Sequence, residues 1–221
     1  MDSPRRPSRR DRLRRVRLYL VVSPQAHGGG WETALARALD TGGIGMVQLR
    51  DKRPGDADFV RRATRVRRLT QASGALFILN DRVHLVEAVD ADGAHVGEAD
   101  LAPPLAREQL GEDRLLGLST HDAMEVARAA ARGADHVGLG PVHASTSKAL
   151  ARTPGGADLL RQALPAAGDL PVFPIGGIRP ENAAALVAAG AKRLAVGAGV
   201  LEADDPAGAV RRLLALFGDT L

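Results

Sequence analysis

Polar and cationic residues gather at the end of one apolar segment, residues 46–52, which reads Met-Val-Gln-Leu-Arg-Asp-Lys. Alternation along a strand would place Gln48, Arg50 and Lys52 on one face, and Val47 and Leu49 on the other. Because apolar segments recur along the chain, we expect this strand to be central in a sheet. Two cations at the end of a central strand need an anion beside them, whereas a solvated strand end would need none. The segment therefore favours an anion-binding site.

Two carboxylates follow other predicted strands. Asp81 and Asp100 come at the ends of adjacent strands, so their side chains can share one ion. Beside three cations, such a pair is either a salt-bridge network or a Mg²⁺ site completed by a polyphosphate. Mg²⁺ prefers oxygen ligands and is often held by one or two carboxylates with substrate phosphates. An acid–base role is disfavoured because neighbouring cations would keep both groups ionised. We favour magnesium.

A third cation and two glycine-rich turns complete the set. Lys148 follows the sixth predicted strand, close behind Ser145 and Ser147. Gly-Gly-Ile at residues 176–178 and Gly-Ala-Gly at residues 197–199 follow the seventh and eighth. Backbone N–H groups in such turns are unobstructed by side chains, and the loops after strands 7 and 8 often hold phosphate in parallel barrels.

Strand and helix patterns alternate along the chain from residue 18 onward. Strands are predicted over residues 18–22, 46–50, 76–80, 93–96, 115–119, 136–139, 172–175 and 193–196. Helices are predicted over residues 31–41, 57–73, 83–89, 104–110, 122–132, 157–164, 180–189 and 206–217. Eight repeats predict a single-domain α/β fold, a closed (β/α)₈ barrel. An open doubly wound sheet is the alternative, but the turn after the first strand lacks the Gly-x-Gly-x-x-Gly spacing.

Composition bounds the class of protein. The 221 residues are 45% hydrophobic, enough for one sizeable core, and contain no cysteine, so disulfides and thiolate metal sites are excluded. No apolar segment is long enough to span a bilayer, and no signal-peptide pattern opens the chain. We expect a cytoplasmic protein without membrane partners.

The positive net charge lies in one short segment. Residues 1–17 carry eight arginines and two aspartates, a charge of +6, which leaves −2 of the overall +4 for the rest. We interpret residues 1–17 as a basic, disordered arm and residues 18–221 as the catalytic barrel. With 3% aromatic residues and no nucleic-acid motif, the body offers no stacking platform, so we expect no nucleic-acid partner.

Several short motifs resemble those of the thiamine phosphate synthase family. They are Gln48-x-Arg50-Asp51-Lys52, Asn80-Asp81-Arg82, His95-Val-Gly-Glu-Ala-Asp100, Gly117-Leu-Ser-Thr-His121, Gly140-Pro-Val142 and Gly176-Gly-Ile178. The resemblance runs from about residue 18 to residue 216, and its specificity lies in the joint order and spacing of the motifs. It implies a (β/α)₈ barrel that condenses an aminopyrimidine methyl diphosphate with a thiazole phosphate to give thiamine phosphate and pyrophosphate.

The resemblance also implies residue roles. The residues implied to bind the pyrimidine diphosphate are Gln48, Arg50, Lys52, Asn80, Ser119 and Lys148. Of these, Arg50, Lys52, Ser119 and Lys148 are expected to act in catalysis. Asp81 and Asp100 would hold Mg²⁺. The residues implied to face the thiazole phosphate are Ser145, Thr146, Ser147, Gly177, Gly197 and Ala198.

Some positions depart from the family pattern. Glu98 stands where glutamine is common, His143 and Ala144 replace Phe-Pro, and Ala198 replaces a frequent serine. A thiazole tautomerase of the same barrel type is the main alternative, and a non-catalytic barrel that binds phosphorylated ligands is another. We favour the synthase because the cation and carboxylate set is complete. Self-association is left open.

Overall fold

Eight parallel strands form the centre of the protein in this computed structural model, which describes residues 7–27, 29–52, 55–144 and 152–218. The strands are β1 (Leu18–Val22), β2 (Ile44–Leu49), β3 (Leu76–Asn80), β4 (Gly93–Val96), β5 (Leu115–Thr120), β6 (His136–Leu139), β7 (Val172–Pro174) and β8 (Leu194–Val196). Each pairs in parallel with its neighbours in the order β7-β6-β5-β4-β3-β2-β1-β8. A parallel bridge between Ile175 and Ala195 joins the two ends of this order. The predicted (β/α)₈ barrel is confirmed.

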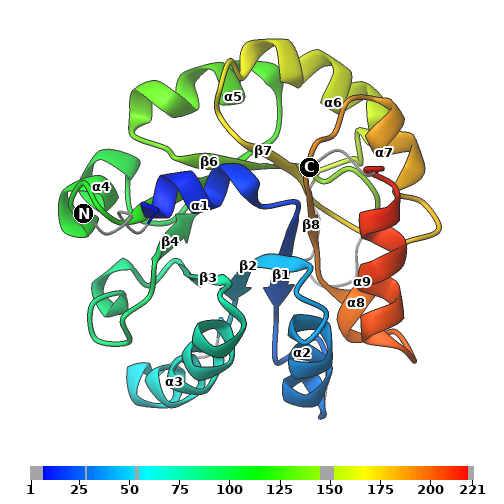
Figure 1. The fold of residues 1–221 in the computed structure, drawn as a ribbon. Coiled ribbons are helices and arrows are strands. Elements are labelled where there is room, and N and C mark those ends of the chain that lie inside the picture. Colours follow the sequence, from blue (N-terminus) through cyan, green and yellow to red (C-terminus); the bar gives the residue numbers. More distant parts are fainter. Residues whose placement is uncertain (1–6, 28, 53–54, 145–151, 219–221) are drawn as a thin grey trace, which may run out of the picture.

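Helices surround the strands (Figure 1). They are α2 (Trp31–Leu39), α3 (Asp56–Ser73), α4 (Pro103–Leu110), α5 (Ala123–Ala129), α6 (Gly156–Ala163), α7 (Ala184–Ala188), α8 (Ala198–Leu201) and α9 (Pro206–Ala215), with short 3₁₀ turns η1 (Val83–Leu85), η2 (Ala130–Arg132) and η3 (Leu164–Ala166). The helix predicted over residues 83–89 is wrong. Only η1 forms there, and a turn with Asp90 at φ 51° leads directly to β4. Helix α8 was not predicted. None of the described helices is both long and apolar enough to cross a bilayer.

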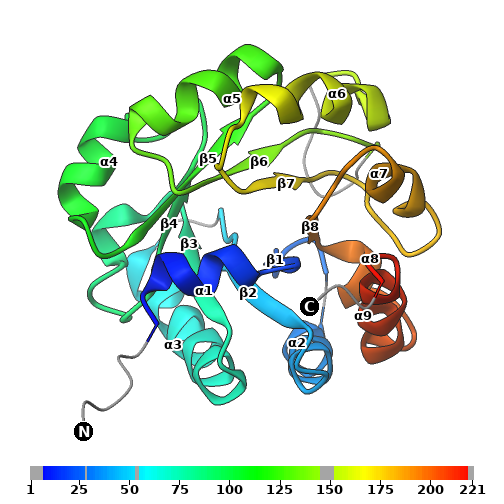
Figure 2. The same cartoon turned by 45° about the horizontal axis from the view of Figure 1, so that its top comes forward.

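An N-terminal helix, α1 (Arg9–Arg15), corrects the expectation of a disordered arm for residues 7–17, the part of it that the structure describes. Ser8 and Asp11 form a capping box at its start, and basic residues occupy its last turn, where they complement the helix dipole. Its apolar residues Leu13 and Val16 are 2% and 4% exposed. Helix α1 lies across the end of the barrel (Figures 1 and 2). The expectation fails because two apolar residues suffice to pack a capped helix.

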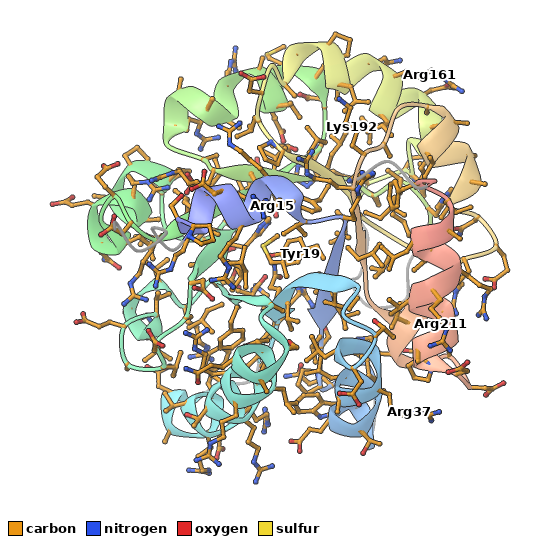
Figure 3. The ribbon with its side chains drawn as sticks, viewed as in Figure 1. Arg15, Tyr19, Arg37, Arg161, Lys192 and Arg211 are labelled. Carbon is orange, nitrogen blue, oxygen red and sulfur yellow. The ribbon has the colours of Figure 1, made fainter. Side chains whose placement is uncertain are left out.

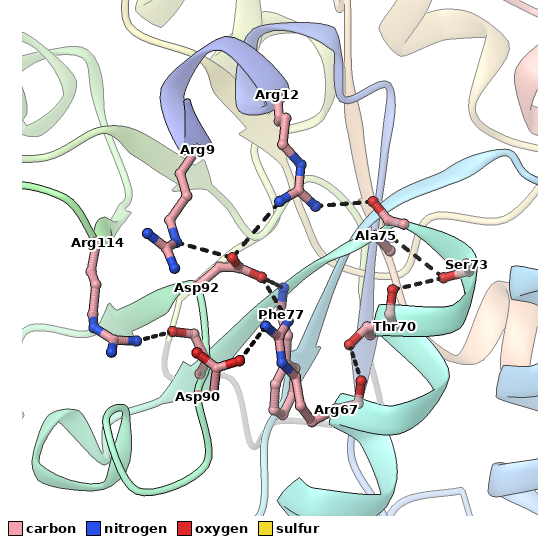
Figure 4. A network of polar contacts seen from close by, with 12 residues as sticks. Arg9, Arg12, Arg67, Thr70, Ser73, Ala75, Phe77, Asp90, Asp92 and Arg114 are labelled. Carbon is pink, nitrogen blue, oxygen red and sulfur yellow. Dashed lines mark hydrogen bonds and ion pairs between the residues drawn. The ribbon is translucent and has the colours of Figure 1, made fainter. Parts of the chain in front are cut away.

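Ion pairs fix α1 to the amino-terminal ends of the strands. Asp92, just before β4, accepts hydrogen bonds from Arg9 at 3.0 Å, from Arg67 of α3 at 3.1 Å and from the Phe77 N–H at 2.9 Å. Arg12 donates to the carbonyl oxygen of Gly74 at 3.0 Å (Figure 4). Because Asp92 is 2% exposed, its charge needs these partners, and they tie α1, α3 and β3 together.

Two layers of core follow from this arrangement. The larger apolar cluster lies between the barrel and its helices. The smaller cluster lies inside the barrel, next to α1. It includes Leu13 of α1 and Val16, which caps that helix, with Tyr19, Met46 and Phe173 of the strands. Figure 3 shows Tyr19 at the centre of the barrel. Helix α1 therefore covers the end of the barrel opposite the carboxyl ends of the strands.

Truncating Leu13 should test whether α1 is part of the folded barrel. Leu13→Ala removes a buried side chain from the inner cluster and should lower the free energy of unfolding by about 2–5 kcal/mol. Arg15→Ala, on the exposed face of the same helix, should change it by less than about 0.5 kcal/mol. Urea unfolding measures both. Equal stability of the two variants would show that the arm is not packed.

Candidate active site

A cavity of about 510 Å³ opens at the carboxyl ends of the strands. This is within the roughly 300–1,000 Å³ usual for small-molecule sites. The predicted site residues that line it are Gln48, Arg50, Lys52, Asn80, Asp81, Asp100, Ser119, Gly177, Gly197 and Ala198. The other four, Ser145, Thr146, Ser147 and Lys148, lie outside the described residues. The structure thus brings together every predicted site residue that it describes.

The segment after β2 aims its cations into the cavity. The Arg50 N–H donates to the carbonyl oxygen of Val22 at 2.8 Å, which extends the strand pairing by one residue. Asp51 points away, where it is 4% exposed, accepts a hydrogen bond from Gln25 and pairs with Arg62 of α3. Alternation then turns Arg50 and Lys52 to the cavity. Asp51 thereby anchors the segment that presents the two cations.

Asp81 and Asp100 lie on the same side of the cavity as Lys52. The Lys52 ammonium pairs with Asp81 and lies 3.9 Å from Asp100. Asp81 adopts a left-handed backbone, with φ 62°, and its N–H donates to the carbonyl oxygen of His95 at 2.9 Å. Asp100 accepts a hydrogen bond from the Gly97 N–H at 2.8 Å. Backbone contacts from β4 thus hold both carboxylates in place.

The pKa values of the two carboxylates shift in opposite directions. Burial raises the pKa of Asp81 above its ordinary value, and Asp100 raises it further, against the effect of Lys52. Burial opposes ionisation of Asp100 too, but hydrogen bonds from Asp81 and from the Gly97 N–H leave the pKa of Asp100 below its ordinary value. Paired, partly buried carboxylates of this kind have the donor chemistry that Mg²⁺ prefers. The pair fits a divalent cation.

Polar side chains linked by hydrogen bonds form the floor of the cavity. Gln48, 4% exposed, donates from its amide nitrogen to the Tyr19 hydroxyl. His95 Nε2 lies 3.1 Å from Ser119 Oγ. Burial raises the pKa of Tyr19, so its hydroxyl stays neutral. These hydrogen bonds fix side chains whose remaining donors and acceptors can meet the edge of a planar, polar ring.

His136 lies among the aromatic residues of the lower barrel. Its ring centroid is 5.6 Å from that of Tyr19 and 5.8 Å from that of Phe173. Neither ring nitrogen has a hydrogen-bond partner among the described residues, and the residue is 0% exposed. Burial lowers the pKa of His136 to about 3, so the imidazole is neutral near pH 7.

Backbone forms the opposite wall of the cavity, at the turns after β7 and β8. Gly177 has a left-handed backbone, with φ 56°, and a Cβ atom there would lie 2.1 Å from the carbonyl oxygen of Ala144. Only glycine lets these two loops approach so closely. The turn after β8 adds Gly197 and Ala198 to the same wall.

Sequence reasoning missed several lining residues. His27, Thr120, Arg152 and Arg179 also line the cavity. Arg152 pairs with Glu98 at 3.1 Å. The negative charge of Glu98, which stands where the family commonly has glutamine, is therefore balanced by Arg152. Thr120 belongs to the motif of residues 117–121 but was given no role. No local pattern marks His27 or Arg152, because their partners, Glu202 and Glu98, lie far away in the sequence.

Comparison with known proteins assigns the chain. The family profile described as thiamine monophosphate synthase matches residues 18–200. The chain belongs to this family. The resemblance found in its motifs is confirmed.

Individual members of the thiamine monophosphate synthase family match nearly full length. The chain is 41% identical over 196 residues to thiamine-phosphate synthase of Moorella thermoacetica, covering 89% of this chain and 93% of that one. It is 41% identical over 204 residues to that of Chloroflexus aurantiacus, covering 92% and 94%. The relative from Synechocystis sp. is longer, and the chain spans 57% of its length.

Solved structures give the same result. Thiamine phosphate pyrophosphorylase from Pyrococcus furiosus superimposes with a TM-score of 0.82 and 28% identity, covering 95% of this chain and 99% of that one. A 3-hexulose-6-phosphate synthase superimposes over 91% of this chain and all (100%) of that one with a TM-score of 0.63, but at 16% identity this likeness shows the fold alone.

The buried neutral His136 should make stability depend on pH. The folded-state pKa of about 3 lies below the unfolded value of about 6.5, so the folded state binds this proton less readily. Stability from this group is full above pH 6.5 and falls by about 1.4 kcal/mol per pH unit down to about pH 3. Between pH 7 and 5 the loss is about 2 kcal/mol, and His136→Phe should abolish it. Urea unfolding at both pH values measures this; an unchanged pH slope would contradict it.

Proposed function

We propose that this protein is a thiamine phosphate synthase, a transferase that condenses an aminopyrimidine methyl diphosphate with a thiazole phosphate and releases pyrophosphate. The observation that carries the proposal is the meeting of Arg50 and Lys52 with two carboxylates at one side of a cavity of suitable size. The near full-length match to relatives named thiamine-phosphate synthase supports it.

Leaving-group charge is the main problem that the site must solve. The bond between the pyrimidine methylene carbon and the diphosphate oxygen breaks, and its electron pair leaves with the diphosphate. The thiazole nitrogen then supplies the pair for the new carbon–nitrogen bond. Arg50 makes no side-chain hydrogen bond or ion pair with any other described residue, so it is free to bind the diphosphate. Preorganised cations lower the barrier because they act most strongly as negative charge builds up. Lys52 and Lys148 are assigned the same role.

The floor residues would hold the pyrimidine. Gln48, Asn80 and Ser119 face the cavity from β2, β3 and β5. Asn80 is 8% exposed and makes no side-chain hydrogen bond with other described residues, which leaves its amide available to the ring. Fixed polar groups in this layer orient the methylene carbon toward the thiazole.

We assign Asp81 and Asp100 as the residues that would hold Mg²⁺. No group of three or more His, Asp or Glu residues suited to a metal occurs among the described residues, so diphosphate oxygens and water would complete the ligand set. When bound, Mg²⁺ neutralises part of the charge on the departing diphosphate. Lys52, which pairs with Asp81 in this structure, would lie close enough to contact the same diphosphate.

The thiazole phosphate is assigned to the wall formed by Gly177, Gly197 and Ala198. Ser145, Thr146 and Ser147, which lie outside the described residues, are assigned to the same substrate. A tautomerase of the same barrel type would leave Arg50, Lys52 and the carboxylate pair without a role. A non-catalytic barrel that binds phosphorylated ligands could use the two cations but does not account for the carboxylate pair. A cytoplasmic location, small-molecule substrates as the partners, and self-association stay predictions.

The reaction is tested by pyrophosphate release. With Mg²⁺ and both substrates, the protein should release one pyrophosphate for each thiamine phosphate formed, since a single bond to the diphosphate breaks. A coupled phosphate assay, with chromatography of the product, measures both. Release that does not depend on the thiazole, or none, would contradict the synthase assignment.

Asp81→Asn tests the metal assignment. It keeps the side-chain shape and tolerates the left-handed backbone, but it removes a charged ligand, so kcat should fall by about 10²–10³ with an unchanged melting temperature. Asp90→Asn is the matched control, because Asp90 also has a left-handed backbone, with φ 51°, and pairs with Arg67 outside the cavity.

If Asp81 is only the ion-pair partner of Lys52, the opposite pattern is expected. The melting temperature of Asp81→Asn would then fall, and the folded fraction would keep its activity. Thermal melting with and without Mg²⁺ and pyrophosphate separates the two cases.

A further inference from the structure

His27 is a buried cavity residue to which the family motifs give no role. It follows β1 in a turn held by hydrogen bonds from the Ala26 and His27 N–H groups to the carbonyl oxygen of Ser23, at 2.9 and 3.1 Å. Its side chain is 1% exposed, yet it lines the cavity. A buried imidazole at a cavity wall either only fills space in the fold or also contacts the ligand.

The two ring nitrogens of His27 are in different situations. Nδ1 lies 3.0 Å from a carboxylate oxygen of Glu202, the residue that follows α8. A carboxylate can only accept, so Nδ1 carries the proton. Nε2 is buried and has no hydrogen-bond partner among the described residues. A buried polar atom left without a partner is costly, and this one lies at the wall of a ligand cavity.

The position of Nε2 identifies what it can reach. It lies 3.9 Å from where a Cβ atom of Gly197 would be. Because Gly197 has no side chain, the imidazole of His27 lies directly beside the turn after β8. Gly197 and Ala198 form the wall to which the thiazole phosphate is assigned. A phosphate oxygen at this wall is the acceptor that a protonated Nε2 requires.

Charge around His27 also favours an anion. Glu202 lies 4.0 Å from the guanidinium of Arg179, which lines the cavity as well. The carboxylate of Glu202 thus lies between Arg179 and His27, and it orients the imidazole through Nδ1. Arg179 brings a cationic group to the same cavity.

We propose that His27, oriented by Glu202, donates an Nε2–H hydrogen bond to the phosphate of the thiazole substrate and so selects the phosphorylated thiazole over the free alcohol. The inference rests on the synthase function proposed above. His27 is a binding residue in this assignment, and Glu202 is a positioning residue that acts through it.

Steady-state kinetics with two thiazoles test the assignment. His27→Phe keeps the ring volume and removes both nitrogens. Losing one charge-assisted hydrogen bond should raise the KM for the thiazole phosphate about 10- to 100-fold. The KM for the pyrimidine diphosphate should not change, and neither should kcat/KM for the unphosphorylated thiazole alcohol, which lacks the acceptor.

Two further variants separate binding from structure. His27→Gln restores a donor of similar reach and should recover part of the affinity for the thiazole phosphate. Glu202→Gln keeps an acceptor for Nδ1 but removes the charge, so the same KM should rise less, about 3- to 10-fold. His84→Phe is the matched control: His84 lies 3.1 Å from the carboxylate of Asp56, outside the cavity, and its loss should leave both KM values unchanged.

The outcomes are distinguishable. If the unaltered protein makes no thiamine phosphate, the synthase function itself fails. If it is active and His27→Phe keeps its KM for the thiazole phosphate, the assignment of His27 is wrong. If His27→Phe loses activity equally toward both thiazoles, with a lower melting temperature that His27→Gln does not restore, His27 is a packing residue and the inference is overturned.

Discussion

Parallel pairing of all eight strands is the constraint on which the rest of the structure depends. Because every strand runs in the same direction, the residues that follow the strands all come to one end of the barrel, however far apart they are in sequence. The bridge between Ile175 and Ala195 closes the circle and brings the turns after β7 and β8 to the loop after β1. The cavity is a consequence of this closure, and no local segment forms it alone.

The two ends of the barrel balance buried charge in different ways. At the amino-terminal end, the buried carboxylate of Asp92 is satisfied by two arginines and one backbone N–H within the fold. At the carboxyl end, Arg50 has no such partner among the described residues, and two carboxylates crowd around Lys52. The charges at the first end are balanced within the fold, whereas at the second end an arginine and a carboxylate pair face a cavity. This asymmetry distinguishes structural from functional charge more clearly than residue type does.

The sequence predicted the barrel and the residues at its mouth because both depend on short-range patterns. Alternation in residues 46–52 was enough to direct Arg50 and Lys52 to one side, and the buried Asp51 anchors them as alternation requires. Helix α1 was missed because its arginines dominate the composition, although Ser8 and Asp11 carry a capping signature and Leu13 lies two residues beyond. The helix predicted over residues 83–89 failed since the turn at Asp90, with a left-handed backbone, returns the chain early.

Residues defined by long-range partners could not be predicted in this way. His27 and Glu202 are 175 residues apart and meet only because β1 and β8 are neighbours in the closed barrel. His136 and His27 show why burial alone does not define function. Both have buried side chains with a ring nitrogen that meets no hydrogen-bond partner in the described part of the chain. The ring of His136 packs between the aromatic side chains of Tyr19 and Phe173 and does not line the cavity. Its unpaired nitrogens therefore lower the stability of the fold and do not indicate a ligand. The open nitrogen of His27 lies at a cavity wall beside glycine, where a bound anion can remove that cost. An unpaired group therefore indicates a ligand when the space beside it is accessible to one.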